Sequence, residues 1–508
     1  MKRYILAHDL GTTGNKATLY DNHGSLVNST FHGYATKYEQ VGWAEQNPED
    51  WWEAVCATTQ ELLRISSIGR DEIACVVFSG QMMGCVPVDQ RGYPIRDAII
   101  WADQRSVEQA RWMAEQISPE EMYRITGHRL SPSYSASKIL WVRDHQPDIY
   151  NETYKFLHAK DSIVARLTGN FVTDRSDAGG MNLYNLEQAE WSEDILQALR
   201  LDPAKLPVIH LSIDVVGEVM SKVSEDIGVA AGTPVVIGGG DGSCAATGAG
   251  VIREGAAYNY IGSSSWIGLA TSKPIYDPEL RTFNWAHLVP DLFTPTGAMQ
   301  TAGGSYQWTR DQLCPLEVNS ANQIGISPYE LMNLQAEQSP TGARGLIFLP
   351  YLLGERSPRW NPNARGAFVG LTMTHTRSDM IRSVLEGIAL NLRVILEAFQ
   401  NQGAKIDAMR VIGGGAQSRL WNQIMANVYG VNVIRLAMLE EATSLGAAIA
   451  GGVGVGLFPD FTIAEELTPI ASVFEVQPKE KAAYDKIYEV FEATYSALEP
   501  IYDQLAKL

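Results

Sequence analysis

Cysteine is scarce in this chain, which also lacks a basic excess and low-complexity segments. Five cysteines occur among 508 residues; they are widely spaced and form no CxxC pair. An odd number without such a pair argues against a disulfide framework and a zinc site. We therefore expect reduced thiols in a cytoplasmic protein. The five are Cys56, Cys75, Cys85, Cys244 and Cys314.

Positive charge is also in short supply, because the formal net charge is -18. Binding to nucleic acid or to an anionic membrane needs a basic face, so neither is an expected partner. No apolar run reaches membrane-spanning length. The N-terminal apolar run ends at His8, too soon for a signal peptide. A phosphate site remains compatible with this charge, because backbone N–H groups suffice to build one.

Several common catalytic motifs are missing as well. The glycine loop at 11–14 lacks the Gly-Lys-Ser/Thr ending of a P-loop. Neither a GxSxG nucleophile elbow nor an HExxH zinc motif occurs. The length exceeds what one hydrophobic core usually supports, so we expect two domains, at residues 1–252 and 253–508.

What the chain does contain is a carboxylate after a glycine run, at 238–242. The run follows the strand-like segment 235–237, and Asp241 is its acidic member. We expect these glycines to let another molecule approach the backbone, and the carboxylate to face a crevice at a strand end. Such a carboxylate can accept the proton of a hydroxyl that attacks a phosphate. The alternative is that Asp241 caps a helix beginning at Gly242.

Two strand–turn–strand units suggest a duplicated architecture. The first joins strands at 4–7 and 16–20 through the Gly-Thr-Thr-Gly turn; the second joins 258–261 and 266–269 through a glycine-serine turn at 262–265. Turns of this kind can wrap a phosphate in backbone amides. Asp9 stands before the first turn, where it either ligates Mg²⁺ or hydrogen-bonds its own loop.

A third glycine turn, at 413–416, follows a strand at 409–412, and a flat adenine would fit over it. Apolar spacing predicts a helix over 378–399 and another near the C-terminus. Asn47 and Pro48 predict the start of an earlier helix. The small residues of 441–452 predict a close-packed helix at a domain junction.

These segments together resemble the FGGY family of carbohydrate kinases, over nearly the whole chain. The stretch 9–14 resembles the family's first phosphate loop, 262–264 its second, 238–242 its catalytic loop and 413–416 its adenosine loop. The stretches 137–141, 354–358 and 366–371 continuing through 385–387 resemble family signatures. The resemblance implies an α/β fold with two RNase H-like (actin-like ATPase/sugar kinase) domains around a central cleft.

The same resemblance implies ATP-dependent phosphorylation of a terminal hydroxyl, with ATP and Mg²⁺ as cofactors. Asp241 would be the general base, and Asp9 with Asp241 would hold the metal. The implied sugar contacts are Gln81, Met82, Trp101, Asp103 and Asp241. The implied ATP contacts are Gly11, Thr12, Thr13, Gly262, Ser263, Ser264, Gly304, Gly414, Gly415 and Ala416. A homodimer is expected by the same analogy.

Within the family, the stretches 43–52 and 80–82 are most similar to xylulokinases, which implies D-xylulose as substrate. Met83 stands where xylulokinases carry His, and Gly242 where they often carry Asn. The stretch 101–105 is closer to gluconokinases. Loss of polar groups that read a sugar can redirect specificity, so gluconate or another small sugar or polyol stays open. A remoter alternative is an actin-like ATPase without a sugar acceptor.

Overall fold

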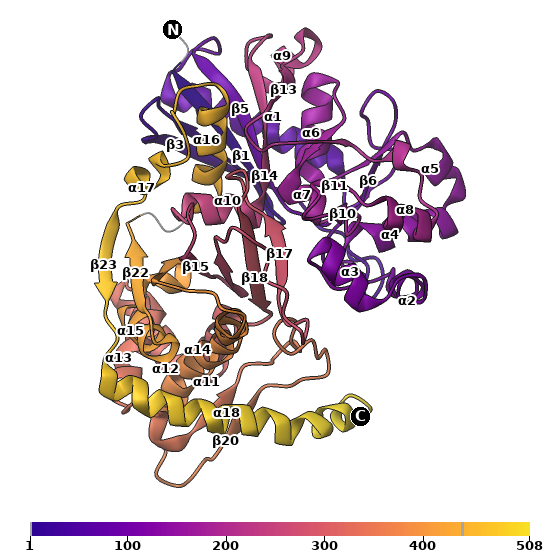
Figure 1. Cartoon of the computed structure of the whole chain (residues 1–508). Coiled ribbons are helices and arrows are strands. Elements are labelled where there is room, and N and C mark those ends of the chain that lie inside the picture. Colours follow the sequence, from indigo (N-terminus) through magenta and orange to yellow (C-terminus); the bar gives the residue numbers. More distant parts are fainter. Residues whose placement is uncertain (1–2, 438–440) are drawn as a thin grey trace.

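The computed structural model describes residues 3–437 and 441–508 and contains two large mixed sheets, one after the other along the chain (Figure 1). The first sheet has the strand order β13-β14-β5-β1-β2-β3. Its strands are β1 (Tyr4–Leu10), β2 (Gly14–Tyr20), β3 (Leu26–Gly33), β5 (Ile73–Gly80), β13 (Val215–Glu218) and β14 (Pro234–Gly240). The second has the order β17-β18-β16-β15-β21-β22-β23. Its strands are β15 (Ala256–Ile261), β16 (Ser265–Leu269), β17 (Phe283–Ala286), β18 (Phe293–Met299), β21 (Ala408–Ile412), β22 (Asn432–Leu436) and β23 (Ile470–Phe474).

The two sheets share one pairing scheme. In the first, β1, β2 and β3 form an antiparallel meander, β1 pairs in parallel with β5, β5 pairs in parallel with β14, and β13 is antiparallel. In the second, β15, β16 and β18 form the meander, β21 and β22 extend it in parallel, and β23 is antiparallel. The two strand–turn–strand units predicted from sequence are confirmed as β1–β2 and β15–β16.

Burial explains the residue types of the central strands. All eight residues of β5 are buried, because helices cover both faces of the parallel part of the sheet. β3 is the opposite case, since it lies at the sheet edge and most of its residues are exposed. The sheet therefore presents the ends of β1, β5 and β14, side by side, at its buried centre.

The predicted helices also form. α1 (Pro48–Ser66) begins after Asn47, whose side chain accepts the Glu49 N–H group, with proline at the first position. α14 (Arg377–Asn401) is buried along most of its length in the second core, and α18 (Pro478–Leu505) crosses that domain near the bottom of Figure 1. The remaining helices of eight or more residues are α2 (Val107–Gln116), α3 (Pro119–Thr126), α4 (Ser135–His145), α6 (Ala159–Thr168), α10 (Asp241–Gly248), α11 (Gly303–Leu313), α12 (Pro315–Ile324), α13 (Pro328–Glu337), α15 (Arg419–Tyr429) and α16 (Ala442–Gly454).

Shorter elements complete the chain. The helices are α5 (Pro147–Glu152), α7 (Arg175–Gly179), α8 (Glu193–Leu199), α9 (Ser221–Ile227), α17 (Ile463–Leu467), η1 (Pro203–Lys205), η2 (Ala343–Gly345) and η3 (Gly414–Gln417). The strands are β4 (Glu45–Gln46), β6 (Val86–Val88), β7 (Ala98–Ile99), β8 (Lys155–Leu157), β9 (Val172–Asp174), β10 (Tyr184–Asn185), β11 (Glu190–Trp191), β12 (Val208–His210), β19 (Ile347–Leu349) and β20 (Ala367–Val369). No helix among the described residues is long and apolar enough to cross a membrane.

α10 and α16 form the junction between the two halves. α16 comes from the second half of the sequence, yet it packs on β1, β5 and β14 of the first sheet (Figure 1). A Cβ on Gly446 would lie 1.9 Å from the Cys244 carbonyl oxygen, and one on Gly248 would lie 1.7 Å from that of Ala442. The small residues therefore allow the two helices to touch backbone to backbone, as the sequence predicts for a close-packed helix.

Candidate active site

Asp241 lies where β14 ends and α10 begins. The helix starts at Asp241 itself, with Gly240 at the capping position, so the expected helix start at Gly242 is wrong by one residue. The Asp241 carboxylate accepts the N–H group of Gly242 through Oδ1 at 2.7 Å. The side chain thus serves the first turn of the helix and still lines a cavity.

The glycines before Asp241 mainly allow other residues of the protein to pack closely against this backbone. Gly238 has φ 68°, and a Cβ there would lie 1.8 Å from the Phe78 carbonyl oxygen. A Cβ on Gly240 would lie 2.5 Å from the Met82 sulfur, whereas one on Gly242 would meet nothing within 4 Å. The expected approach of another molecule to this backbone is therefore open at Gly242, while the preceding glycines allow close internal packing.

Two carboxylates lie near strand ends of the first sheet, Asp9 in β1 and Asp241 directly after β14. Burial, together with the nearby charge of Asp9, raises the pKa of Asp241 to about 7. Burial likewise raises the pKa of Asp9, although the Ser79 hydroxyl, at 3.0 Å, donates to that carboxylate. Mg²⁺ takes oxygen ligands and keeps several waters, so two neighbouring carboxylates of this kind fit it. A bound cation would also lower the cost of holding both groups ionised.

A small cavity of about 170 Å³ lies beside Asp241. Three of the predicted sugar contacts, Met82, Trp101 and Asp241, line it together, whereas Gln81 and Asp103 do not. The buried carboxylate of Asp103 accepts hydrogen bonds from the Ala44 N–H group, at 2.6 Å, and from Arg105. The buried amide of Gln81 donates to Gln46 at 2.8 Å. Contact of Gln81 or Asp103 with a sugar stays a prediction.

The first predicted phosphate loop connects β1 to β2. The Thr12 hydroxyl accepts a hydrogen bond from the Trp101 indole N–H at 2.9 Å, which ties this loop to the wall of the small cavity. Within the described residues, the N–H groups of Thr12 and Thr13 have no hydrogen-bond partner. Gly11 closes the turn, because its N–H group donates to Gly14. The loop therefore presents two free donors at the end of a strand, as an anion site requires.

The second predicted phosphate loop repeats this geometry between β15 and β16. The N–H groups of Ser263 and Ser264 also lack a partner among the residues that the structure describes. The Gly304 N–H group donates to the Ser263 carbonyl at 2.9 Å, so Gly304 supports the loop from behind. Gly262 is held by its hydrogen bonds with Ser264 and Gly303.

A larger cavity of about 880 Å³ opens on the other side of this loop. Gly414 and Gly415 line it, together with Gly262 and Ser263, whereas Ala416 is buried and does not. Ser264 lines the small cavity. The glycine-serine loop therefore borders both cavities, and a molecule in the large one can direct a phosphate toward the small one past this loop.

The structure adds residues that the sequence did not single out for this site. The Trp266 indole donates to the Tyr258 hydroxyl at 2.9 Å, which donates to the Gly242 carbonyl at 2.9 Å, so the second half buttresses the Asp241 turn. Trp285 and Arg356 also line the small cavity. The Arg356 guanidinium forms no hydrogen bond or ion pair with any described residue. Arg356 lies in the stretch 354–358, which the sequence analysis identified as similar to the family. The sequence did not predict that its side chain lines this cavity.

Comparison with known proteins agrees with this architecture. The model of the FGGY family of carbohydrate kinases, N-terminal domain, matches residues 4–248, and that of the C-terminal domain matches residues 257–455. The xylulose kinase of Staphylococcus epidermidis is 33% identical over 500 residues, covering 97% of each chain. The gluconokinase of Bacillus subtilis is 31% identical over 509 residues, covering 100% of this chain and 96% of the other.

A solved structure extends the likeness to three dimensions. The ligand-bound xylulose kinase from Lactobacillus acidophilus matches with a TM-score of 0.91 at 28% identity, over 99% of both chains. The expected pair of α/β domains of the actin-like kinase type is thereby confirmed. This chain belongs to the FGGY family of carbohydrate kinases, which are phosphotransferases with an alcohol group as acceptor.

Proposed function

We propose that this kinase transfers the γ-phosphate of ATP to the terminal hydroxyl of D-xylulose, forming D-xylulose 5-phosphate. The observation that carries the proposal is the position of Asp241, which lines a sugar-sized cavity one loop away from a nucleotide-sized one. Several similar proteins bear the name xylulose kinase. A family member must bring a hydroxyl, a base and a phosphate together, and this is where the chain can do so.

ATP occupies the large cavity in this proposal. Adenine lies over Gly414 and Gly415, where a Cβ on Gly414 would meet nothing within 4 Å. The free N–H groups of the two strand–turn–strand loops hold the β- and γ-phosphates from opposite domains. We assign residues 1–252 to one domain and 253–508 to the other, with α16 reaching across to the first sheet.

Asp241 accepts the proton of the attacking hydroxyl, because its pKa near 7 suits a general base at neutral pH. Asp9 and Asp241 would hold Mg²⁺, which supplies positive charge to neutralise the transferring phosphate when bound. The aromatic wall of Trp101, Trp266 and Trp285 excludes water from the acceptor, so that ATP is not lost to hydrolysis.

A second candidate substrate is an aldonate such as gluconate. The unpaired Arg356 guanidinium at the small cavity offers a carboxylate the bidentate partner it prefers. A ketose carries no negative charge that could pair with the Arg356 guanidinium. Met83 removes the polar side chain that xylulokinases carry at that position. Membership in a carbohydrate kinase family speaks against the remoter idea of an ATPase without an acceptor.

A coupled ADP-release assay with Mg-ATP and a panel of pentuloses, gluconate, glycerol and tetritols tests both candidates. Selective turnover of D-xylulose supports the first. Selective turnover of gluconate that falls in Arg356→Gln, but not in the exposed control Arg253→Gln, supports the second. ATP hydrolysis that no carbohydrate stimulates contradicts both. Light scattering tests the expected homodimer.

A further inference from the structure

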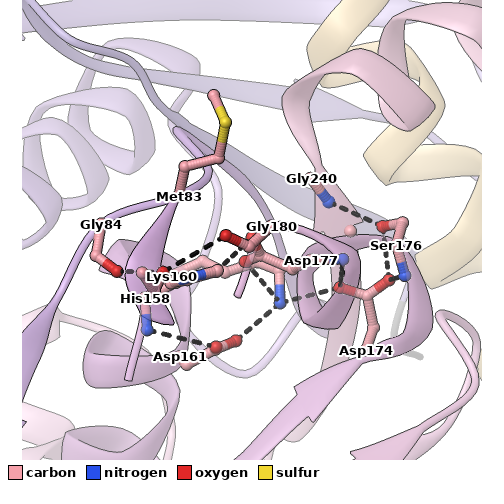
Figure 2. Close-up of polar contacts among 12 residues, drawn as sticks. Met83, Gly84, His158, Lys160, Asp161, Asp174, Ser176, Asp177, Gly180 and Gly240 are labelled. Atoms are coloured by element: carbon pink, nitrogen blue, oxygen red, sulfur yellow. Dashed lines mark hydrogen bonds and ion pairs between the residues drawn. The ribbon is translucent and has the colours of Figure 1, made fainter. Parts of the chain in front are cut away.

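A network of buried charges lies beneath the active site, in the domain of the first sheet (Figure 2). Its centre is Lys160 on α6, which is fully buried. The ammonium lies 2.6 Å from Asp161, 3.0 Å from Asp174 and 3.3 Å from Asp177. These carboxylates are also buried, and burying charge is costly unless partners compensate for it. The network calls for a reason beyond packing.

Metal binding is not that reason. The ligand atoms of His158, Asp161 and Asp177 lie within 4.8 Å of one another, which makes them the candidate metal group among the described residues. The Lys160 ammonium already pairs with two of the three. The Lys160 ammonium therefore occupies the position between these carboxylates that a metal ion would need.

One end of the network reaches the catalytic strand. The Gly240 N–H group donates to the Ser176 hydroxyl at 2.9 Å, and that hydroxyl donates to Asp174. The Ser176 N–H group donates to the same carboxylate at 2.7 Å. Gly240 directly precedes Asp241, so this chain of contacts fixes the backbone from which the proposed base extends.

The other end reaches the loop that carries Met83. His158 Nδ1 lies 2.5 Å from Asp177, and its Nε2 lies 2.8 Å from the Ser135 hydroxyl. That hydroxyl donates to the Gly84 carbonyl at 2.6 Å, which has no other donor within the described residues. The imidazole therefore bridges Asp177 and the Ser135 hydroxyl, which also lies 3.3 Å from the Gly180 carbonyl.

The Met83 loop is held tightly and forms part of the sugar cavity. Met83 has φ 63°, a left-handed conformation that is uncommon for a side-chain-bearing residue. The buried Lys138 ammonium donates to its carbonyl at 2.9 Å. The Met83 side chain points away from the charges in Figure 2 and lines the small cavity.

We infer that the network through Asp174, Lys160, Asp177 and His158 is a positioning device that holds the Asp241 backbone and the Met83 loop at a fixed separation. Ion pairs away from water are stiff, because each buried group loses its only compensation if it moves. The acceptor hydroxyl and its base are thereby kept in register across the cavity. This inference rests on the proposed role of Asp241.

Single hydroxyl deletions test the two ends without removing a buried charge. Ser176→Ala frees the Gly240 end, and we expect kcat to fall about tenfold with little change in the KM for sugar, because small displacements of reacting groups are costly. Ser135→Ala frees the Met83 loop, and we expect the KM for sugar to rise about tenfold, since the cavity wall loosens. The matched control is Ser162→Ala, because Ser162 is a buried serine on α6 that bonds only its own helix.

Kinetics in both variants that match those of the Ser162 control would overturn the inference, whatever their melting temperatures. A readout independent of the sugar separates this failure from a wrong substrate. The ¹³C ε-methyl resonances of Met82 and Met83 are recorded in the full-length protein without ligand. We expect the Met83 signal to shift or broaden in Ser135→Ala and to stay in place in the control; an unmoved signal contradicts the inference even if no sugar is turned over.

Discussion

At the scale of single residues, the proposed site depends on a carboxylate whose ionised form is disfavoured by its surroundings. Asp241 is partly buried at a strand end; desolvation raises the pKa of both Asp241 and Asp9, and the charge of Asp9 adds to the shift at Asp241. Carboxylates with pKa values raised in this way cluster at functional sites. The sequence predicted both aspartates from their glycine-rich surroundings. Burial and the distance between them depend on the folded chain.

Replacing Asp241 by Asn should remove the base while preserving shape. We expect kcat to fall by about 10²–10⁴-fold, the range typical of general-base catalysis. Affinity for ATP measured without Mg²⁺ should stay within about twofold, because the large cavity does not include this residue. Steady-state kinetics and calorimetric titration with ATP measure the two quantities. Retained turnover would remove Asp241 from its proposed role.

The pH dependence of the wild-type reaction follows from the same group. A general base works only when it is deprotonated, so kcat/KM for the sugar should rise with pH on the acidic side and level off by about pH 7, or at lower pH where a bound cation favours the ionised form of Asp241. The slope arises on the acidic side because the raised pKa keeps Asp241 protonated there. A profile measured from pH 5 to 9 checks this, and a flat profile from pH 5 to 7 would contradict it.

At the scale of elements, the candidate site is built from loops that follow strands, and the glycines of these loops differ in what lies next to them. Gly414 faces open space, whereas a Cβ on its neighbour Gly415 would lie 2.4 Å from the Ile261 side chain. The sequence shows only a run of identical residues. Which glycine admits a ligand and which admits the protein's own strand depends on what packs behind the loop.

These two glycines give a matched pair of variants. Gly414→Ala should fold normally and raise the KM for ATP, because the new methyl group projects where nothing of the protein lies. Gly415→Ala should destabilise the protein by about 1–3 kcal/mol, the usual cost of overpacking. Thermal unfolding and ATP titration distinguish them. Equal melting temperatures for the two variants would show that the loop adjusts freely.

At the scale of the whole molecule, two similar domains are joined by helices that cross between them. α16 covers the first sheet although it belongs to the second half of the chain, and its Gly446 touches α10 directly. The helix that begins with Asp241 is therefore packed against an element of the other domain.

The free energy of unfolding of the whole chain should depend on pH through Asp241. Its folded pKa is raised from 3.8 to about 7, so its contribution to stability is full below pH 3.8 and is lost as pH rises to about 7. Asp241→Asn does not titrate. The free energy of unfolding of this variant should therefore rise relative to that of the wild type between pH 4 and pH 7, by the order of 1 kcal/mol after allowance for solvent screening, as thermal unfolding measures it. The exposed change Glu489→Gln on α18 serves as the control and should show no such trend.

Features that depend on neighbours along the chain can be predicted from the sequence. They are local patterns, and together they indicate the family: strand–turn–strand units, the Asn47 cap, amphipathic helices and the order of the glycine loops. The remaining features depend on contacts that form only in the folded chain. His158, Lys160 and Asp174 are buried together by segments that are distant in sequence. Likewise, only folding brings Arg356 to the small cavity and pairs the Asp103 carboxylate with Arg105. Burial and contact between segments far apart in sequence set the charge, access and partners of each group, and these are properties that no local pattern encodes.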